Sequence, residues 1–114
     1  METIGDFERM RELMRKEDLA LFYLSRPGCG VCAALKPKIL SLLDSEFPEI
    51  PFYDVNLDEV PEAGGQLSIF TIPAVLVFSG GREWIREARY MAIDELTEKI
   101  RRLASLRRGQ TAGE

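Results

Sequence analysis

The chain has 114 residues, 46% of them hydrophobic, and this length suits a single domain of ordinary size. Its formal charge is -4, so it lacks the basic excess that drives binding to nucleic-acid phosphates. It contains no histidine, which excludes histidine acid–base catalysis, and its two cysteines supply only half of a four-thiolate metal site.

The N-terminal region has the features of neither a secretory signal nor a membrane span. Acidic residues follow Met1 closely, and no apolar run reaches the ~20 residues that a membrane helix needs. We therefore expect a soluble, cytoplasmic protein with no membrane or nucleic-acid partner and no bound metal. Residues 1–108 are expected to form the one domain. Residues 109–114 are expected to form a mobile tail, because they offer nothing to pack.

The first predicted element is an amphipathic helix that ends near Lys16. Thr3 followed by Asp6 is typical of a capping box at the start of such a helix. Five apolar residues then recur at helical spacing: Ile4, Phe7, Met10, Leu13 and Met14. The apolar run over residues 19–24 comes next and predicts a central strand covered on both faces.

A turn over residues 25–28 leads into a long helix that begins at Cys29. The apolar residues of this helix keep helical spacing until Pro48 marks its end. Pro37 lies inside it and is expected to kink it, because proline has no N–H and its ring clashes with the preceding turn.

The second half of the chain predicts three strands and two helices. Residues 51–57 alternate enough for a strand, and residues 58–68 predict a short, irregular helix. A diglycine turn between residues 74–78 and 83–88 favours an antiparallel hairpin. The buried stripe of a closing helix is supplied by Ile93, Leu96, Ile100 and Leu103. Helical crossovers between the first strands imply parallel pairing, so the pattern predicts an α/β fold.

Cys29 and Cys32 stand three positions apart on the first turn of the long predicted helix. This spacing sets both thiols on one side and within disulfide reach. The unpaired N–H groups and the dipole of the helix favour a thiolate at Cys29, and Arg26 adds positive charge nearby. Cys29 is therefore the candidate nucleophile and Cys32 the candidate resolving thiol. The alternative is that both are ordinary small buried residues.

The chain resembles the thioredoxin superfamily through three motifs at matching separations: FYLSRPGCGVC at 22–32, Pro37, and FTIP at 70–73. The resemblance implies a thioredoxin-like three-layer α/β/α fold with a central mixed four-stranded sheet and an extra N-terminal helix. It also implies that Pro73 is a cis-proline facing the cysteines. The backbone of Ile72 would then face the substrate, which pairs with it as an added strand.

Five residues depart from the pattern of that family. Gly28 stands where typical members have a tryptophan before the first cysteine, and Val31 replaces the proline between the cysteines, so the family's reduction potential cannot be carried over. Tyr23 stands at the position of the family's buried aspartate and Asp54 at that of its lysine partner. Asp54 is therefore a candidate for tuning the pKa of Cys32, the alternative being a solvated carboxylate at a strand end. Arg89 stands near the position of a glycine at the rim of the substrate groove.

We predict a cytosolic dithiol–disulfide oxidoreductase that acts as a monomer on protein disulfides and binds no organic cofactor. Its predicted site combines Cys29 and Cys32 with Ile72 and Pro73. The resemblance implies that electrons arrive from a thioredoxin reductase or a low-molecular-weight thiol. Two alternatives stay open: a glutaredoxin-like reductase, and a thioredoxin-fold binding or chaperone module with catalytically idle cysteines.

Overall fold

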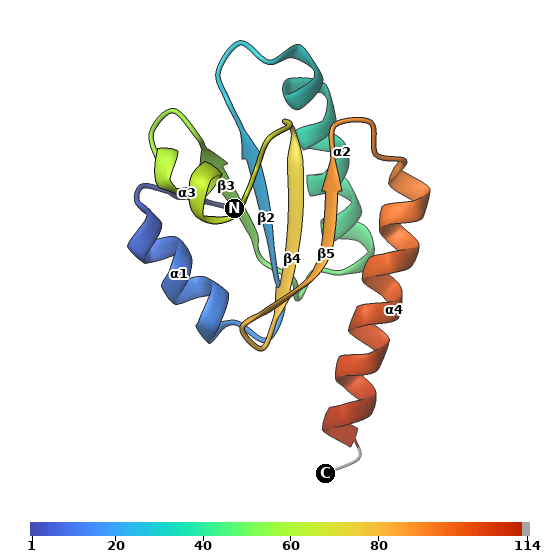
Figure 1. Cartoon of the computed structure of the whole chain (residues 1–114). Helices are drawn as coiled ribbons and strands as arrows, with labels where there is room; N and C mark the ends of the chain where they lie inside the picture. Colours follow the sequence, from blue (N-terminus) through green and yellow to red (C-terminus); the bar gives the residue numbers. More distant parts are fainter. Residues whose placement is uncertain (113–114) are drawn as a thin grey trace.

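The apolar run in the first third of the chain forms the central strand of a five-stranded sheet, with helices on both faces (Figure 1). The computed structural model describes residues 1–112. The strands are β1 (Glu2–Ile4), β2 (Ala20–Ser25), β3 (Phe52–Asn56), β4 (Ala74–Ser79) and β5 (Arg82–Ala88). The helices are α1 (Phe7–Lys16), α2 (Gly30–Glu46), α3 (Pro61–Gln66) and α4 (Ile93–Ala112).

The strand order in the sheet is β1-β3-β2-β4-β5. β2 pairs in parallel with β3 and antiparallel with β4, and β4 pairs antiparallel with β5. The predicted parallel pair and the predicted hairpin are therefore both confirmed. Gly80 and Gly81 join the hairpin strands at φ values of 59° and 83°, a region that residues with a Cβ rarely adopt.

Two hydrophobic clusters lie on opposite faces of the sheet, which gives the molecule three layers. In β2, Leu21 and Tyr23 face the cluster formed with α2 and α4, whereas Phe22 faces the cluster formed with α1 and α3. This alternation is the period of two that a strand imposes on its side chains. Both faces of β2 are buried, as its unbroken apolar sequence predicts. Within the described residues, no helix has the length and apolar character needed to cross a bilayer.

The N-terminal segment differs from the sequence prediction. Residues 2–4 form β1, which pairs in parallel with β3, so the sheet has five strands rather than four. The predicted capping role of Thr3 is wrong, because Thr3 belongs to this strand. The N-cap of α1 is Asp6, whose Oδ1 accepts a hydrogen bond from the N–H of Arg9 at 2.8 Å.

The remaining helices follow the predicted order with small changes in their bounds. α2 contains Pro37 as expected, and its N-cap is Cys29. α3 is only six residues long, with Pro61 in its first turn, where a missing N–H breaks no helical hydrogen bond. α4 continues to Ala112, so the expected tail over residues 109–114 starts within this helix. The last two residues of the expected tail, 113–114, lie outside the described part of the chain.

Removing the Asp6 carboxylate should destabilise the fold through the N-terminus of α1. We expect Asp6→Ala to lower the free energy of unfolding by about 1 kcal/mol, because one helical N–H loses its acceptor. The control is Thr3→Ala, whose exposed side chain makes no cap, and a change within about 0.5 kcal/mol is expected for it. Urea unfolding of the native chain and both variants measures the change in the free energy of unfolding. A larger loss for Thr3→Ala than for Asp6→Ala would contradict the assignment of the cap.

Candidate active site

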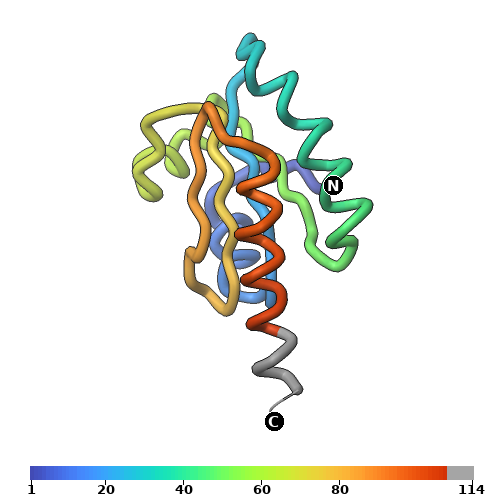
Figure 2. Tube along the Cα trace, turned by 90° about the vertical axis from the view of Figure 1, so that its right-hand side faces the viewer, coloured from blue at the N-terminus to red at the C-terminus, as the bar shows by residue number. Residues whose placement is uncertain are grey.

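Three segments that are distant in sequence meet at one end of the sheet. The pairing register is decisive: Ala74, the first residue of β4, pairs with Leu24 on one side and with Ala88 on the other. The segment after β2, the segment before β4 and the segment after β5 therefore leave the sheet side by side. Figure 1 and Figure 2 show these loops together at the end where α2 begins. The fold thus brings the CxxC turn to the Ile72–Pro73 segment.

Cys29 and Cys32 form a disulfide, so the structure represents the oxidised protein. Their Cα atoms are 5.2 Å apart, within the usual range for a bridged pair. The backbone N–H of Cys32 donates to Sγ of Cys29 at 3.2 Å. Cys32 is buried, whereas Cys29 is partly exposed. Cys29 is therefore the more accessible residue of the pair.

The electrostatic environment of Cys29 comes mainly from the helix that follows it. Cys29 is the N-cap of α2, where backbone N–H groups and the helix dipole favour negative charge. The predicted contribution from Arg26 is partly offset, because its Nε lies 3.1 Å from Oδ1 of Asp58. Both side chains of this ion pair are more than half exposed, so solvent screens it as well.

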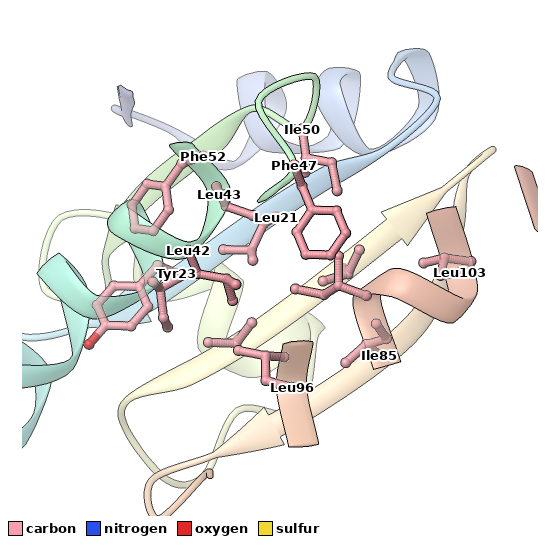
Figure 3. Close-up of a cluster of buried hydrophobic side chains, with 14 of the residues drawn as sticks. Leu21, Tyr23, Leu42, Leu43, Phe47, Ile50, Phe52, Ile85, Leu96 and Leu103 are labelled. Atoms are coloured by element: carbon pink, nitrogen blue, oxygen red, sulfur yellow. The ribbon is translucent and has the colours of Figure 1, made fainter. Parts of the chain in front are cut away.

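Tyr23 connects the centre of the sheet to the CxxC turn. Its hydroxyl donates to the carbonyl oxygen of Cys32 at 2.5 Å, although the residue itself is fully buried. Burial, together with the negative charge of Asp54, raises the pKa of Tyr23 to about 12. Figure 3 shows the Tyr23 ring among the buried side chains of the α2 and α4 face, beside Phe52. The sequence identified the position of Tyr23 but not this hydrogen bond.

Asp54 lies opposite Tyr23 in the register of β2 and β3. Its Oδ2 accepts a hydrogen bond from Nζ of Lys36 at 2.7 Å, and the Asp54 side chain is only 20% exposed. The carboxylate is thus held between the sheet and α2 rather than solvated at a strand end. The sequence analysis missed Lys36. The available signal was its spacing, because a residue four positions beyond Cys32 lies on the same face of the helix.

The proposed substrate-binding residues Ile72 and Pro73 precede β4, and the peptide bond between them is cis. Both of their carbonyl groups accept hydrogen bonds from Arg89. The backbone N–H of Arg89 donates to the Pro73 oxygen at 2.6 Å, and its Nη1 donates to the Ile72 oxygen at 3.2 Å. The sequence shows Arg89 only as a departure from a family glycine and does not predict these contacts. Within residues 1–112, no cluster of three or more potential metal-ligating side chains occurs.

A disulfide at the start of a helix, with one cysteine more accessible than the other, is suited to exchange with external thiols. The family model for thioredoxin matches residues 5–102 of the chain. The chain therefore belongs to the thioredoxin family. This membership, together with the Cys29–Cys32 pair, supports thiol–disulfide oxidoreductase function for the chain.

Two relatives of the chain have almost the same length as it. The chain is 37% identical over 110 residues to thioredoxin-like protein YdfQ of Bacillus subtilis, covering 96% of this chain and 97% of the relative. It is 30% identical over 102 residues to thioredoxin-like protein YusE of the same organism, covering 84% and 95%. Among solved structures, Fasciola hepatica thioredoxin superposes with a TM-score of 0.79 at 26% identity, covering 90% of this chain and 98% of that one.

The raised pKa of Tyr23 predicts a specific loss of stability in alkali. A group whose pKa is raised on folding favours the folded state below its unfolded pKa of 10.0, and this contribution disappears as the pH rises to about 12. We therefore expect Tyr23→Phe to be less stable than the native chain by about 1 kcal/mol at pH 7, because the hydrogen bond to Cys32 is lost. Between pH 10 and 12 its stability should fall less steeply.

Urea unfolding at several pH values measures this difference. Tyr90→Phe is the control at pH 7, because Tyr90 is 83% exposed and removal of its hydroxyl should leave the stability there unchanged. Equal slopes for the native chain and Tyr23→Phe above pH 10 would contradict the prediction.

Proposed function

We propose that the chain reduces disulfide bonds in protein substrates. The observation that carries this proposal is the Cys29–Cys32 disulfide, which has its more exposed sulfur at the N-cap of α2. In the reduced protein, the Cys29 thiolate attacks one sulfur of the substrate disulfide, and the other substrate sulfur leaves as a thiolate that takes up a proton. The Cys32 thiolate then attacks Sγ of Cys29, releasing the second substrate thiol. Two electrons pass to the substrate, and the chain returns to the disulfide form.

The backbone at Ile72 and Pro73 is the proposed binding surface for the substrate. This segment leaves the sheet next to the CxxC turn, because β4 begins beside the last residues of β2. An extended peptide that pairs with the Ile72 backbone as a short added strand, beyond the end of β4, brings a target disulfide to Cys29. Main-chain pairing of this kind accepts many sequences, which suits a reductase with several protein substrates.

Asp54 is the proposed proton acceptor for Cys32 in the release step. It lies on β3 opposite Tyr23, whose hydroxyl contacts the Cys32 carbonyl, so the carboxylate belongs to the layer beneath the first turn of α2. Lys36 keeps this carboxylate paired in the oxidised protein. A general base at this place is needed only when Cys32 loses its proton.

The proposal includes a reducing partner and a compartment. Thioredoxin reductase or a low-molecular-weight thiol returns the Cys29–Cys32 disulfide to the dithiol, and a reducing compartment such as the cytoplasm favours this direction. We propose that the chain works there as a monomer. An insulin-reduction assay is run with each electron donor in turn. A glutaredoxin-like reductase would depend on the low-molecular-weight thiol, so activity with thioredoxin reductase distinguishes the two.

The two cysteines should give opposite results when each is replaced. We expect Cys29→Ser to lower insulin reduction to the uncatalysed background, because the attacking sulfur is lost. Cys32→Ser should instead accumulate a mixed disulfide between Cys29 and the substrate, because nothing resolves it. An insulin-reduction assay measures the first outcome, and mass spectrometry of the trapped species measures the second.

The double variant Cys29→Ser/Cys32→Ser is the control and should trap nothing. Equal trapping by both single variants would contradict the assigned order of attack. A chain with catalytically idle cysteines, as in a binding or chaperone module, would trap no substrate in any variant.

Replacing the Asp54 carboxylate should affect the second step alone. We expect Asp54→Asn to slow release of the mixed disulfide about tenfold or more, while the first attack by Cys29 stays within about twofold of the native rate. Lys36→Met is the matched control, because it breaks the same ion pair but keeps the carboxylate. Rapid-quench kinetics separates the two steps. Native release by Asp54→Asn, or equal slowing by Lys36→Met, would remove Asp54 from this role.

A further inference from the structure

Arg89 places a positive charge beside the proposed binding segment. Its side chain is partly buried, its guanidinium lies 5.1 Å from the centre of the Tyr90 ring, and Nη1 donates to the Ile72 carbonyl. Within the described part of the chain it forms no ion pair with a carboxylate. Arg26, in the turn before Cys29, is by contrast paired with Asp58. Arg89 therefore offers a positive charge beside Ile72 that no carboxylate of the described residues neutralises through an ion pair.

Hydrogen bonds hold both the backbone and the guanidinium of Arg89. Arg89 has a φ of 54°, in the left-handed region that favours glycine and costs an arginine conformational energy. Its N–H is held at 2.6 Å by the Pro73 carbonyl, so backbone and side chain bind two successive carbonyl groups. A side chain held at both ends loses little further freedom when it binds a ligand.

The surroundings of Arg89 favour an extended peptide as the ligand. An open groove of about 160 Å³ borders the same segments, since its lining includes Thr71, next to Ile72, and Ala88, next to Arg89. Phe70 also lines this groove and is 91% exposed. An apolar side chain of a partner can therefore pack against its ring. A peptide that passes Ile72 thus meets a cation and an apolar groove side by side.

The geometry points to Arg89 as a specificity residue that selects protein disulfides with an acidic residue beside the target cysteine. This inference rests on the function proposed above. A guanidinium has five N–H donors in a planar fork, and the Ile72 carbonyl uses one of them. The remaining donors are free to bind a carboxylate, which forms its strongest pairs with arginine.

The test compares two disulfide-containing peptides that differ only in a Glu or a Gln next to the target cysteine. Each peptide is mixed with a stoichiometric amount of the pre-reduced full chain, and its single-turnover reduction is followed by chromatography. We expect the native chain to reduce the Glu peptide about two- to fivefold faster, the range of a half-exposed ion pair. Arg89→Gln should bring this ratio to about one.

Arg82→Gln is the matched control. Arg82 is likewise an arginine stacked on an aromatic ring, 4.8 Å from the centre of Trp84, but it lies at the other end of β5. Its replacement removes the same charge from the chain, so any effect of net charge is equal in the two variants. We expect Arg82→Gln to keep the native ratio. Arg89→Gly is a second variant, which removes the guanidinium while suiting the positive φ, and it should also give a ratio of about one.

The outcomes separate this inference from the proposed function. Equal rates for the two peptides with the native chain would overturn the selectivity of Arg89 and leave the reductase function standing. The selectivity is overturned in the same way if both Arg89 variants keep the native ratio, or if Arg82→Gln loses it. Reduction of neither peptide would overturn the proposed function and this inference with it.

Discussion

The hydrogen bond from the Tyr23 hydroxyl to the Cys32 carbonyl joins the buried centre of the sheet to the turn that carries both cysteines. A hydroxyl buried among apolar side chains needs a partner, because an unpaired polar group there costs about 1–3 kcal/mol. The first turn of α2 supplies that partner. The Tyr23 ring also packs 5.7 Å from that of Phe52, so its own position is set by the core. The CxxC turn is therefore tied to the packed core through Tyr23.

Strand register is the second constraint on the site, and much of it could be predicted from the sequence. The unbroken apolar run of β2 indicated a strand buried on both faces, and the Gly80–Gly81 pair indicated the hairpin. The helical crossover indicated the parallel pairing of β2 with β3. These signals are local, which is why the sequence alone contains them. The antiparallel pairing of β2 with β4 is not part of the hairpin, and together with the hairpin it brings Cys29, Ile72 and Arg89 to one end of the sheet.

The features that the sequence could not predict depend on contacts between distant segments. β1 has only three residues, too few for any periodicity, and it is a strand because β3 pairs with it. That pairing takes Thr3 into the sheet and leaves Asp6 as the helix cap, a choice that residue type does not decide. The pairing of Lys36 with Asp54 likewise joins residues 18 positions apart. It requires the position of α2 over the sheet, which no short pattern specifies.

The charges around the site show why net charge is a poor guide to its partners. The chain has 19 acidic and 15 basic residues, so its field as a whole repels an acidic partner. At physiological ionic strength this field is screened beyond about 8 Å. Within that distance of the Ile72 carbonyl lies Arg89, which has a 3.2 Å hydrogen bond to it and no carboxylate partner in the described chain. The net charge of -4 is therefore a weak guide to what binds at the site, because the guanidinium nearest to Ile72 governs the contact that a partner makes there.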